Sequence, residues 1–323
     1  MFNKMFDVIT FGSAAQDVHI KSNAFRILDG KICMPFGSKV EVGDIVLSSG
    51  GGGTNTAATF AKQGLKVAFC GAIGADPAGL EIVRELRVLR IDTRFLVKKK
   101  EKKTNHSIII SNNGEDRTIL VYRGASDLME KNDIPWKKIR ARWFYLAPLT
   151  GVLCDNFGQL VDFAKKNKIK IAVNPSMQQL ALPELKNILQ KVDILFLNQE
   201  EASFLTKISF GKEAEIFQKI DEICPGIAVM TKGGEGAVAS DGQCIYSAKP
   251  DAVRKIVDTT GAGDSFAAGF LSGYIKYNKD IVKSVQLGLA NSAGNLSEIG
   301  AKTGILDKKS DFKRVEVQKY EIS

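Results

Sequence analysis

The second half of the chain alternates short apolar runs with longer amphipathic runs, and this alternation constrains the fold more than any other feature. From about residue 140, the apolar runs RWFYLAP, KIAVNP, VDILFLN and GIAVMT have the length of strands. Helix-length segments such as DNFGQLVDFAKKNK separate them. Strands that alternate with helices predict βαβ units and a largely parallel sheet covered on both faces. Ligands of such sheets bind at the carboxyl ends of the strands.

The first half is less regular and predicts two β-rich patches. After the strand-like run FDVITFG, residues 19–49 read as short strands and turns, and a helix is expected to begin near Thr54. Farther along, HSIIIS and RTILVYR flank the turn signal NNGED and predict a hairpin. The two patches, at about 16–50 and 93–123, can form one small sheet. Since no linker or repeat divides the chain, we expect a single domain over residues 1–323.

The composition argues against several classes of protein. The 323 residues, of which 44% are hydrophobic, can bury a large core. No apolar run approaches the roughly 20 residues that cross a bilayer, so no membrane association is expected. The five cysteines are scattered and the start lacks the pattern of a signal peptide, which favours the cytoplasm.

The net charge of +9 raises the question of a nucleic-acid partner. Part of the excess comes from KKKEKK at 98–103, which reads as a solvated loop, and the rest is spread along the chain. We therefore expect no nucleic-acid partner. A basic surface that attracts phosphorylated substrates is an alternative that the sequence does not rank above a solvated loop.

The stretch VDTTGAGDSFAAG, at 257–269, predicts an anion site where a helix begins. Gly261 and Gly263 leave the backbone free to point several amides at one spot, and the helix dipole adds partial positive charge there. Asp264 follows in the first helical turn. It could simply complement the dipole, worth about 0.3–1 kcal/mol, or accept a proton from a substrate hydroxyl during phosphoryl transfer.

This stretch resembles the C-terminal signature of the ribokinase-like, or PfkB-type, kinases of sugars and nucleosides. The run SGGGGTNTAATFAKQGLKVAFCGAIGADPAG, at 49–79, resembles their N-terminal signature, and the resemblance covers nearly the whole chain. It implies a three-layer α/β/α domain with a mostly parallel central sheet and a small β-sheet lid that closes over the substrate. It also implies an ATP-dependent kinase with Asp264 as the catalytic base and the backbone of Gly261, Ala262 and Gly263 as the anion hole.

The same resemblance implies where the acceptor binds. Gly52, Gly53 and Asn55 would line the sugar site, because glycines let the backbone approach a ligand closely; the alternative is a flexible turn. Asp17, five residues past Gly12 at the end of the first strand, would grip two hydroxyls, because an ionised carboxylate only accepts hydrogen bonds; the alternative is a solvated turn residue. Arg123 could contact an acidic substrate or hold the lid to the main domain.

The residues that would bind the phosphate donor ATP and its ions are also assigned by this resemblance. Asn198 and Glu201, in FLNQEEAS, match an N-x-x-E motif and would hold Mg²⁺ largely through water, although the pair also fits a capping box. In VMTKGGEGAVAS a predicted hairpin follows the glycines, which argues against a dinucleotide fingerprint. No Walker-type P-loop occurs in the chain. The expected nucleotide contacts are Asn198, Thr231, Gly233, Gly236 and Thr260, and Asp258, Thr260 and Gly300 could bind K⁺.

Three hypotheses about function remain open, and the first is slightly favoured. The first is a kinase that phosphorylates a primary hydroxyl of a ribose- or fructose-like sugar. The second is a nucleoside kinase of the same mechanism, for which Phe25, Met34 and Phe36 of the lid could form an apolar wall for the base; the alternative is that they are lid core or dimer contacts. The third is a binding relative without catalysis, which the intact GAGD sequence argues against. Since an exposed lid sheet often pairs with a second copy in this family, a homodimer is also expected.

Overall fold

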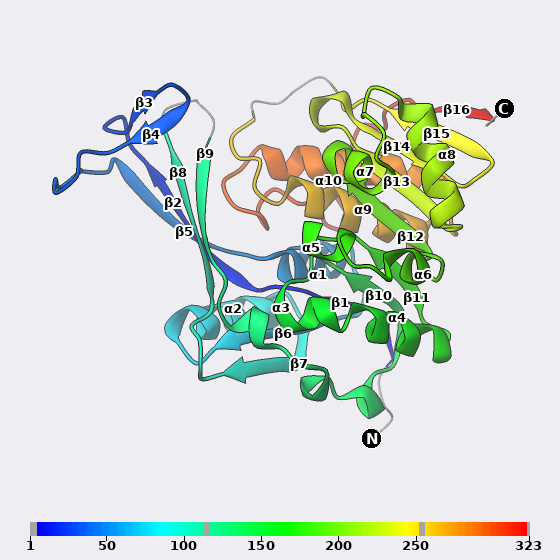
Figure 1. Cartoon of the computed structure of the whole chain (residues 1–323), viewed down its shortest axis with the longest axis horizontal. Coiled ribbons are helices and arrows are strands. Elements are labelled where there is room, and N and C mark those ends of the chain that lie inside the picture. The colour runs from blue at the N-terminus through cyan, green and yellow to red at the C-terminus, as the bar shows by residue number, and fades with distance from the viewer. Residues whose placement is uncertain (1–4, 113–116, 252–255, 322–323) are drawn as a thin grey trace.

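The computed structural model describes residues 5–112, 117–251 and 256–321, and it shows a large α/β body with a small β-sheet projecting from it (Figure 1). The strand order in the large sheet is β16-β15-β14-β13-β12-β11-β10-β1-β6-β7. The pairs from β7 to β13 are parallel, and those from β13 to β16 are antiparallel. The strands are β1 (Phe6–Phe11), β6 (Val67–Gly74), β7 (Asp92–Lys99), β10 (Ala141–Leu146), β11 (Lys170–Val173), β12 (Ile194–Asn198), β13 (Ile227–Thr231), β14 (Ala237–Ser240), β15 (Cys244–Ala248) and β16 (Gln318–Glu321).

Helices cover both faces of this sheet, because its central strands carry apolar side chains on both sides. Every residue of β6 is buried, and two separate hydrophobic clusters fill the two spaces between sheet and helices. The predicted three-layer α/β/α fold is therefore confirmed. One face packs against α1 (Gly52–Lys62), α2 (Pro77–Val88), α9 (Ala262–Lys276) and α10 (Ile281–Leu296). The other packs against α3 (Gly151–Asp155), α4 (Phe157–Lys166), α5 (Met177–Leu180), α6 (Leu185–Leu189), α7 (Gln199–Thr206) and α8 (Glu213–Ile223).

The small sheet joins two segments that are far apart in the sequence. Its strand order is β5-β2-β8-β9, and the central pair, β2 with β8, is parallel. A two-stranded ribbon, β3 with β4, extends beyond it at the tip (Figure 1). The antiparallel pairing of β8 with β9 confirms the predicted hairpin, whose turn lies outside the described residues. The strands are β2 (Ala15–Lys21), β3 (Arg26–Leu28), β4 (Lys31–Cys33), β5 (Asp44–Gly50), β8 (Asn105–Ser111) and β9 (Arg117–Tyr122).

The predicted boundary of the second lid segment was wrong. We expected this segment to begin at residue 93, but β7 pairs with β6 at the end of the large sheet, and the small sheet resumes only at Asn105. Strand β7 is an edge strand in which Phe95 alone is buried, so its sequence resembles that of a half-exposed lid strand.

Register divides the small sheet into two faces. Asp17, Ser48 and Ser107 lie opposite one another and share the inner face, which meets the body of the molecule. Leu47 and Leu120 lie on the outer face, where their side chains are 62% and 52% exposed. No helix among the described residues is long and apolar enough to cross a membrane.

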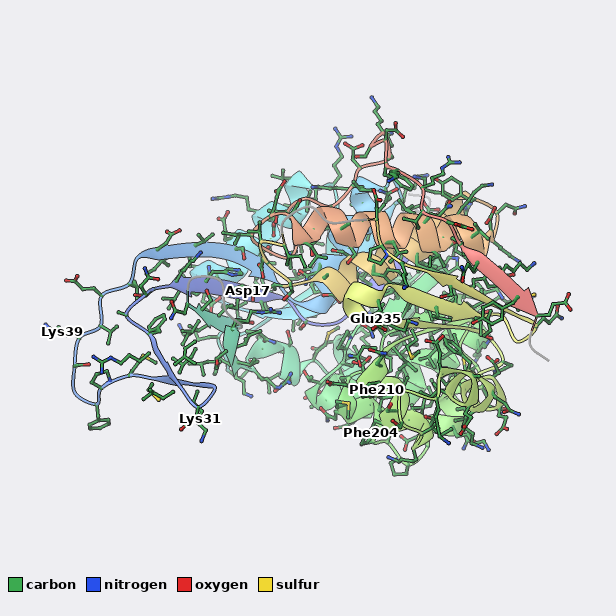
Figure 2. All side chains as sticks on the ribbon, turned by 90° about the horizontal axis from the view of Figure 1, so that it is seen from above. Asp17, Lys31, Lys39, Phe204, Phe210 and Glu235 are labelled. Carbon is green, nitrogen blue, oxygen red and sulfur yellow. The ribbon has the colours of Figure 1, made fainter. Side chains whose placement is uncertain are left out.

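The aromatic tip of the small sheet lies away from the inner face. Met34 and Phe36 are exposed, and Figure 2 shows the tip around Lys31 and Lys39 at the far end from Asp17. Phe25 is buried instead. In this structure these side chains therefore do not form a wall for a nucleoside base, and the burial of Phe25 fits the alternative of a lid-core residue.

Candidate active site

The site is built around the start of α9, where the sequence predicted an anion hole. Gly261 caps this helix with a φ of 80°, a left-handed conformation that side chains disfavour, and a Cβ there would lie 2.5 Å from the Cβ of Ala301. A Cβ on Gly263 would meet nothing within 4 Å. Since the first amides of a helix have no carbonyl of their own helix to bond, the backbone of 261–263 offers donors to an anion.

Asp264 lies in the first turn of α9 and is held by the start of α1. Asn55 donates a hydrogen bond from Nδ2 to Oδ2 of Asp264 over 2.9 Å. A Cβ on Gly52 would lie 3.4 Å from Oδ1 of Asp264. Burial raises the pKa of Asp264, the bond from Asn55 opposes this shift, and the charge of Asp17 adds to it. A carboxyl group with a raised pKa is a stronger base once it is ionised.

Asp17 reaches the same place from strand β2 of the small sheet. It is 3% exposed, and a Cβ on Gly50 would lie only 2.0 Å from its Oδ2, so the carboxylate packs directly against the glycine run. Burial raises the pKa of Asp17, while a hydrogen bond with Ser107 and the charges of His19 and Lys302 lower it. The structure therefore brings Asp17, Gly52, Asn55 and Asp264 together.

Lys302 is a charged residue of this region that the sequence analysis did not single out. Its side chain is 5% exposed, and Nζ donates to Ser49 Oγ over 2.5 Å and pairs with Glu85 Oε2 over 3.1 Å. Burial lowers the pKa of Lys302, whereas the charges of Glu85, Asp17 and Asp264 raise it. A single lysine in a loop has no pattern that marks it, so sequence reasoning had no signal for it.

Asp258 joins the loop before α9 to the loop that contains Gly300. Its Oδ1 accepts hydrogen bonds from the backbone N and the hydroxyl of Thr260, over 2.9 and 2.7 Å. Its Oδ2 accepts one from the backbone N of Gly300 over 3.0 Å, and His19 Nδ1 lies 3.8 Å away. Burial raises the pKa of Asp258, but these hydrogen bonds outweigh it and hold the pKa below its ordinary value. The three residues expected around K⁺ are thus neighbours.

Asn198 and Glu201 form the capping box that the sequence allowed. Asn198 Oδ1 accepts from the Glu201 backbone N, and Glu201 Oε2 accepts from the Asn198 backbone N, both over 2.8 Å. Burial raises the pKa of Glu201. Asn198 is the last residue of the parallel strand β12, so this capping box lies at the carboxyl edge of the sheet. The pKa of the buried Tyr145 hydroxyl is raised first by burial and then by the charges of Asp264 and Glu201.

The remaining predicted contacts lie at neighbouring strand ends. Thr231 is paired in register with Asn198. Gly233 has a φ of 56°, and a Cβ there would meet no atom within 4 Å. At Gly236 a Cβ would lie 2.0 Å from the carbonyl oxygen of Ala248, so the packing requires glycine at this position. Strands β14 and β15 confirm the predicted hairpin after it. Among the described residues, no group of three or more His, Cys, Asp or Glu side chains is arranged to hold a metal.

Arg123 is not placed in the site by any described contact. Its side chain is exposed at the end of β9. Its role as an anchor of the acceptor or of the small sheet stays a prediction.

The basic run at 98–103 includes one lysine with an acidic partner. Lys99 pairs with Asp133 over 2.7 Å.

A parallel α/β sheet, with a carboxylate beside a glycine-opened helix start, is the framework of an enzyme that handles an anionic group. The profile described as pfkB family carbohydrate kinase matches residues 5–309. The chain therefore belongs to this family, whose members phosphorylate hydroxyl groups.

Named relatives include kinases of both substrate classes. The ribokinase of Staphylococcus aureus is 29% identical over 264 residues, which cover 79% of this chain and 84% of the relative. A nucleoside kinase of Methanothermobacter thermautotrophicus is 27% identical over 276 residues, covering 83% and 85%. Among solved structures, the ribokinase of Arabidopsis thaliana with ribose and ATP superimposes with a TM-score of 0.80 at 21% identity, covering 95% of this chain and 97% of that one. At this level of identity, the similarity to the solved structure shows a shared fold and nothing further.

Proposed function

We propose that this protein transfers the γ-phosphate of ATP to a primary hydroxyl of a small sugar of the ribose or fructose type. The observation that supports this most is the convergence of Asp264, the first amides of α9 and Asp17 at one place. Asp264 would accept the proton of the attacking hydroxyl, and Asp17 would bind two further hydroxyls. The amides of 261–263 would stabilise the charge on the phosphoryl group during transfer.

The residues present suit ATP and its ions. The first-turn amides of α9, which have no carbonyl partner within their own helix, and the open space at Gly263 and Gly233 are compatible with phosphate groups. Asn198 and Glu201 would hold Mg²⁺ largely through water, which matches the small number of protein ligands that this ion uses. Backbone oxygens near Asp258, Thr260 and Gly300 would hold K⁺. When bound, Mg²⁺-ATP supplies the phosphoryl group and part of the positive charge that stabilises it.

The small sheet would close over the acceptor and exclude water, since water competes with the sugar for the phosphoryl group. Its outer face, with Ile45, Leu47, Leu120 and Tyr122 exposed, would pair with a second copy of this chain. Sedimentation tests this pairing: we expect a dimer for the wild type and a monomer for Leu47→Lys. The five cysteines are all unpaired, which suits the reducing cytoplasm, the compartment that we propose.

A nucleoside acceptor is the second candidate, and one observation favours it. Val121 lies on the inner face in register with Asp17, and Val46, Ile109 and Ile119 lie on the same face farther along the strands, at the level of His19. A ribose bound at Asp17 would thus leave room for an apolar contact with a base. This wall would replace the tip residues Met34 and Phe36.

One assay tests both candidates. ADP release from Mg²⁺-ATP is measured with ribose, fructose, phosphosugars, sugar acids, adenosine, guanosine and cytidine, with Asp264→Asn as the control. We expect turnover of one sugar that the variant abolishes. Turnover of a nucleoside alone would replace the first candidate with the second, and absence of turnover with every acceptor would contradict the proposed function.

A further inference from the structure

A buried cluster of hydrogen bonds attaches the small sheet to the body just before β8. Asp76, the N-cap of α2, accepts a bond from the backbone N of Gly79 over 3.0 Å. It also accepts two bonds from Thr104, one from the hydroxyl over 2.6 Å and one from the backbone N over 2.9 Å. The Thr104 hydroxyl in turn accepts a bond from the backbone N of Gly74, the last residue of β6, over 3.0 Å. Thr104 is therefore bound both to α2 and to β6, and we call Asp76 and Thr104 the clamp.

Three glycines allow the clamp to close. A Cβ on Gly74 would lie 2.4 Å from the backbone N of Thr104, and one on Gly79 would lie 2.8 Å from its hydroxyl oxygen. A Cβ on Gly124 would lie 2.1 Å from the carbonyl oxygen of Lys103. A side chain at any of these glycines would push this part of the chain away from the body, so three separate segments are fitted to one point.

The residue after the clamp extends the attachment toward β2. Asn105 Oδ1 accepts hydrogen bonds from the backbone N of Gly124 and of Ser126, over 3.1 and 3.2 Å. The Ser126 hydroxyl donates to the carbonyl of Ala72 over 3.2 Å and accepts from the backbone N of Ala14 over 3.5 Å. Because Ala14 immediately precedes β2, the strands β2 and β8 leave the body bound to the same group of residues.

The parallel pairing of these two strands connects the clamp to the site. Strands β2 and β8 are parallel neighbours, and Asp17 lies opposite Ser107, three residues after Thr104. A hairpin turn cannot join parallel strands, so their relative position depends on where each strand leaves the body. Asp264 lies on α9, in the body itself. The start of β8 therefore helps to set how Asp17, on the small sheet, lies relative to the base.

A purely structural interpretation competes with this one. An N-cap needs one bond from its side chain to an amide of the first turn, and Asp76 makes this bond with Gly79. In the structural interpretation, the two bonds from Thr104 only satisfy buried polar groups. They are nevertheless additional to the cap, and they come from the residue at which the chain enters the small sheet. The two interpretations differ in what the acceptor experiences when the clamp is weakened.

We propose that Thr104, held by Asp76, is a positioning residue for phosphoryl transfer, which acts through β8 and β2 on the placement of the acceptor. The proposal rests on the proposed function, because it takes Asp17 as the acceptor ligand and Asp264 as the base. Thr104 itself does not touch the acceptor. A misplacement of about 1 Å can cost on the order of 10² in rate, so a small displacement of β2 is enough to matter.

The chain offers a matched pair of substitutions. Thr104→Val removes the hydroxyl and keeps the branched shape and the backbone N–H, whereas Thr104→Ser keeps the hydroxyl. Ser240→Ala is the control, because the Ser240 hydroxyl is also buried, donates to the carboxylate of Asp221 over 2.9 Å and accepts from the backbone N of Gly242 over 3.1 Å. Ser240 pairs with Ala228 near the start of β13, at the edge of the sheet opposite the site.

Steady-state kinetics separate the two interpretations. ADP release is measured with Mg²⁺-ATP and ribose, or with whichever acceptor of the panel above the wild type turns over. For Thr104→Val we expect kcat/KM for the acceptor to fall by about 10², with the KM for ATP unchanged. Thr104→Ser should keep the wild-type values, and Ser240→Ala should lower the melting temperature without changing either constant. A Thr104→Val enzyme with a lowered melting temperature but a wild-type kcat/KM for the acceptor would overturn the proposal.

A milder variant decides the question if Thr104→Val does not fold. Ser126→Ala removes the bond to the backbone N of Ala14, at the start of β2, and leaves the clamp in place. We expect kcat/KM for the acceptor to fall by a smaller factor, again with an unchanged KM for ATP. An unchanged value for the acceptor would then refute the positioning role.

Hydrogen exchange measures the attachment without turnover. The backbone amides of β2 and β8 are followed in the full chain without ligand, for the wild type, Thr104→Val and Ser240→Ala. We expect faster exchange in both strands for Thr104→Val and not for the control. Unchanged exchange in β2 would show that the clamp does not hold this strand, and would overturn the proposal. Faster exchange in β2, in a protein whose wild type phosphorylates no acceptor, would uphold the clamp and contradict only the proposed function.

Discussion

The substitution Gly263→Ala separates the stability of α9 from its use as an anion hole. A Cβ at this position meets no atom within 4 Å, and Gly263 is exposed in the first turn of the helix. Replacing glycine by alanine at a compatible helical position stabilises a protein by about 0.4–1 kcal/mol, chiefly because the unfolded chain loses freedom. We therefore expect a small rise in melting temperature.

Activity should move in the opposite direction. The Cβ of a helical residue is tilted toward the helix amino terminus, which is here the space assigned to the phosphoryl group. A methyl group there would disturb a charge-stabilising contact, and loss of one such contact costs on the order of 10²–10³ in kcat. Steady-state ADP release and thermal unfolding of the same preparation measure both effects.

A matched control exists in the chain. Gly158 is the second residue of α4, as Gly263 is of α9, and its Cβ would lie 3.6 Å from Cδ1 of Ile188, an ordinary contact. Gly158→Ala should give the same gain in stability with unchanged kcat. A Gly263→Ala enzyme that turns over as fast as the wild type would refute the anion hole.

Three further predictions follow from the contacts around the base. Gly50→Ala places a Cβ against the buried Asp17 carboxylate; we expect a loss of about 1–3 kcal/mol in unfolding free energy and a raised KM for the acceptor, and a wild-type KM would contradict the placement of Asp17. Asn55→Ala removes the hydrogen bond that lowers the pKa of Asp264, so the acid limb of kcat should move to higher pH, and a fixed limb would count against Asp264 as the base. Glu201→Gln can keep the capping bond to the Asn198 amide, so we expect an unchanged melting temperature but a higher Mg²⁺ requirement in the ADP-release assay; an unchanged requirement would argue against the proposed metal role.

The parts of the site that the sequence predicted are those encoded by neighbouring residues. The GAGD stretch combines glycines with a helix start, and its Asp264 and Gly261 lie where the pattern indicated. The capping pair of Asn198 and Glu201 is likewise a local pattern, three residues apart, and the structure contains it. Local patterns are readable because they depend on backbone geometry within one turn.

The parts that the sequence did not predict depend on contacts between distant segments. Lys302 meets Glu85 and Ser49 from more than 200 residues away, and no spacing rule connects them. The error at β7 has a similar cause: an edge strand of the large sheet and a strand of the small sheet are both only partly buried, and only pairing distinguishes them. The roles of the apolar residues Met34 and Phe36 stayed open because the sequence does not tell which way an exposed tip points.

The central claim is that Asp264 is an ionised, poorly solvated base, and the variant Asp264→Asn tests it most directly. Because burial raises the pKa of Asp264 in the folded state, its ionisation costs stability as the pH rises through that pKa; below the ordinary aspartate pKa no such cost exists. Asparagine cannot ionise, so the variant should melt at a higher temperature than the wild type at neutral pH, with no such advantage in acid.

The decisive measurement is ADP release by Asp264→Asn at neutral pH with the accepted sugar, beside thermal unfolding of the same sample. The account predicts a folded variant, at least as stable as the wild type, whose turnover falls by about 10²–10⁴. A folded variant that keeps wild-type turnover would show that another group takes the proton, and would contradict the account.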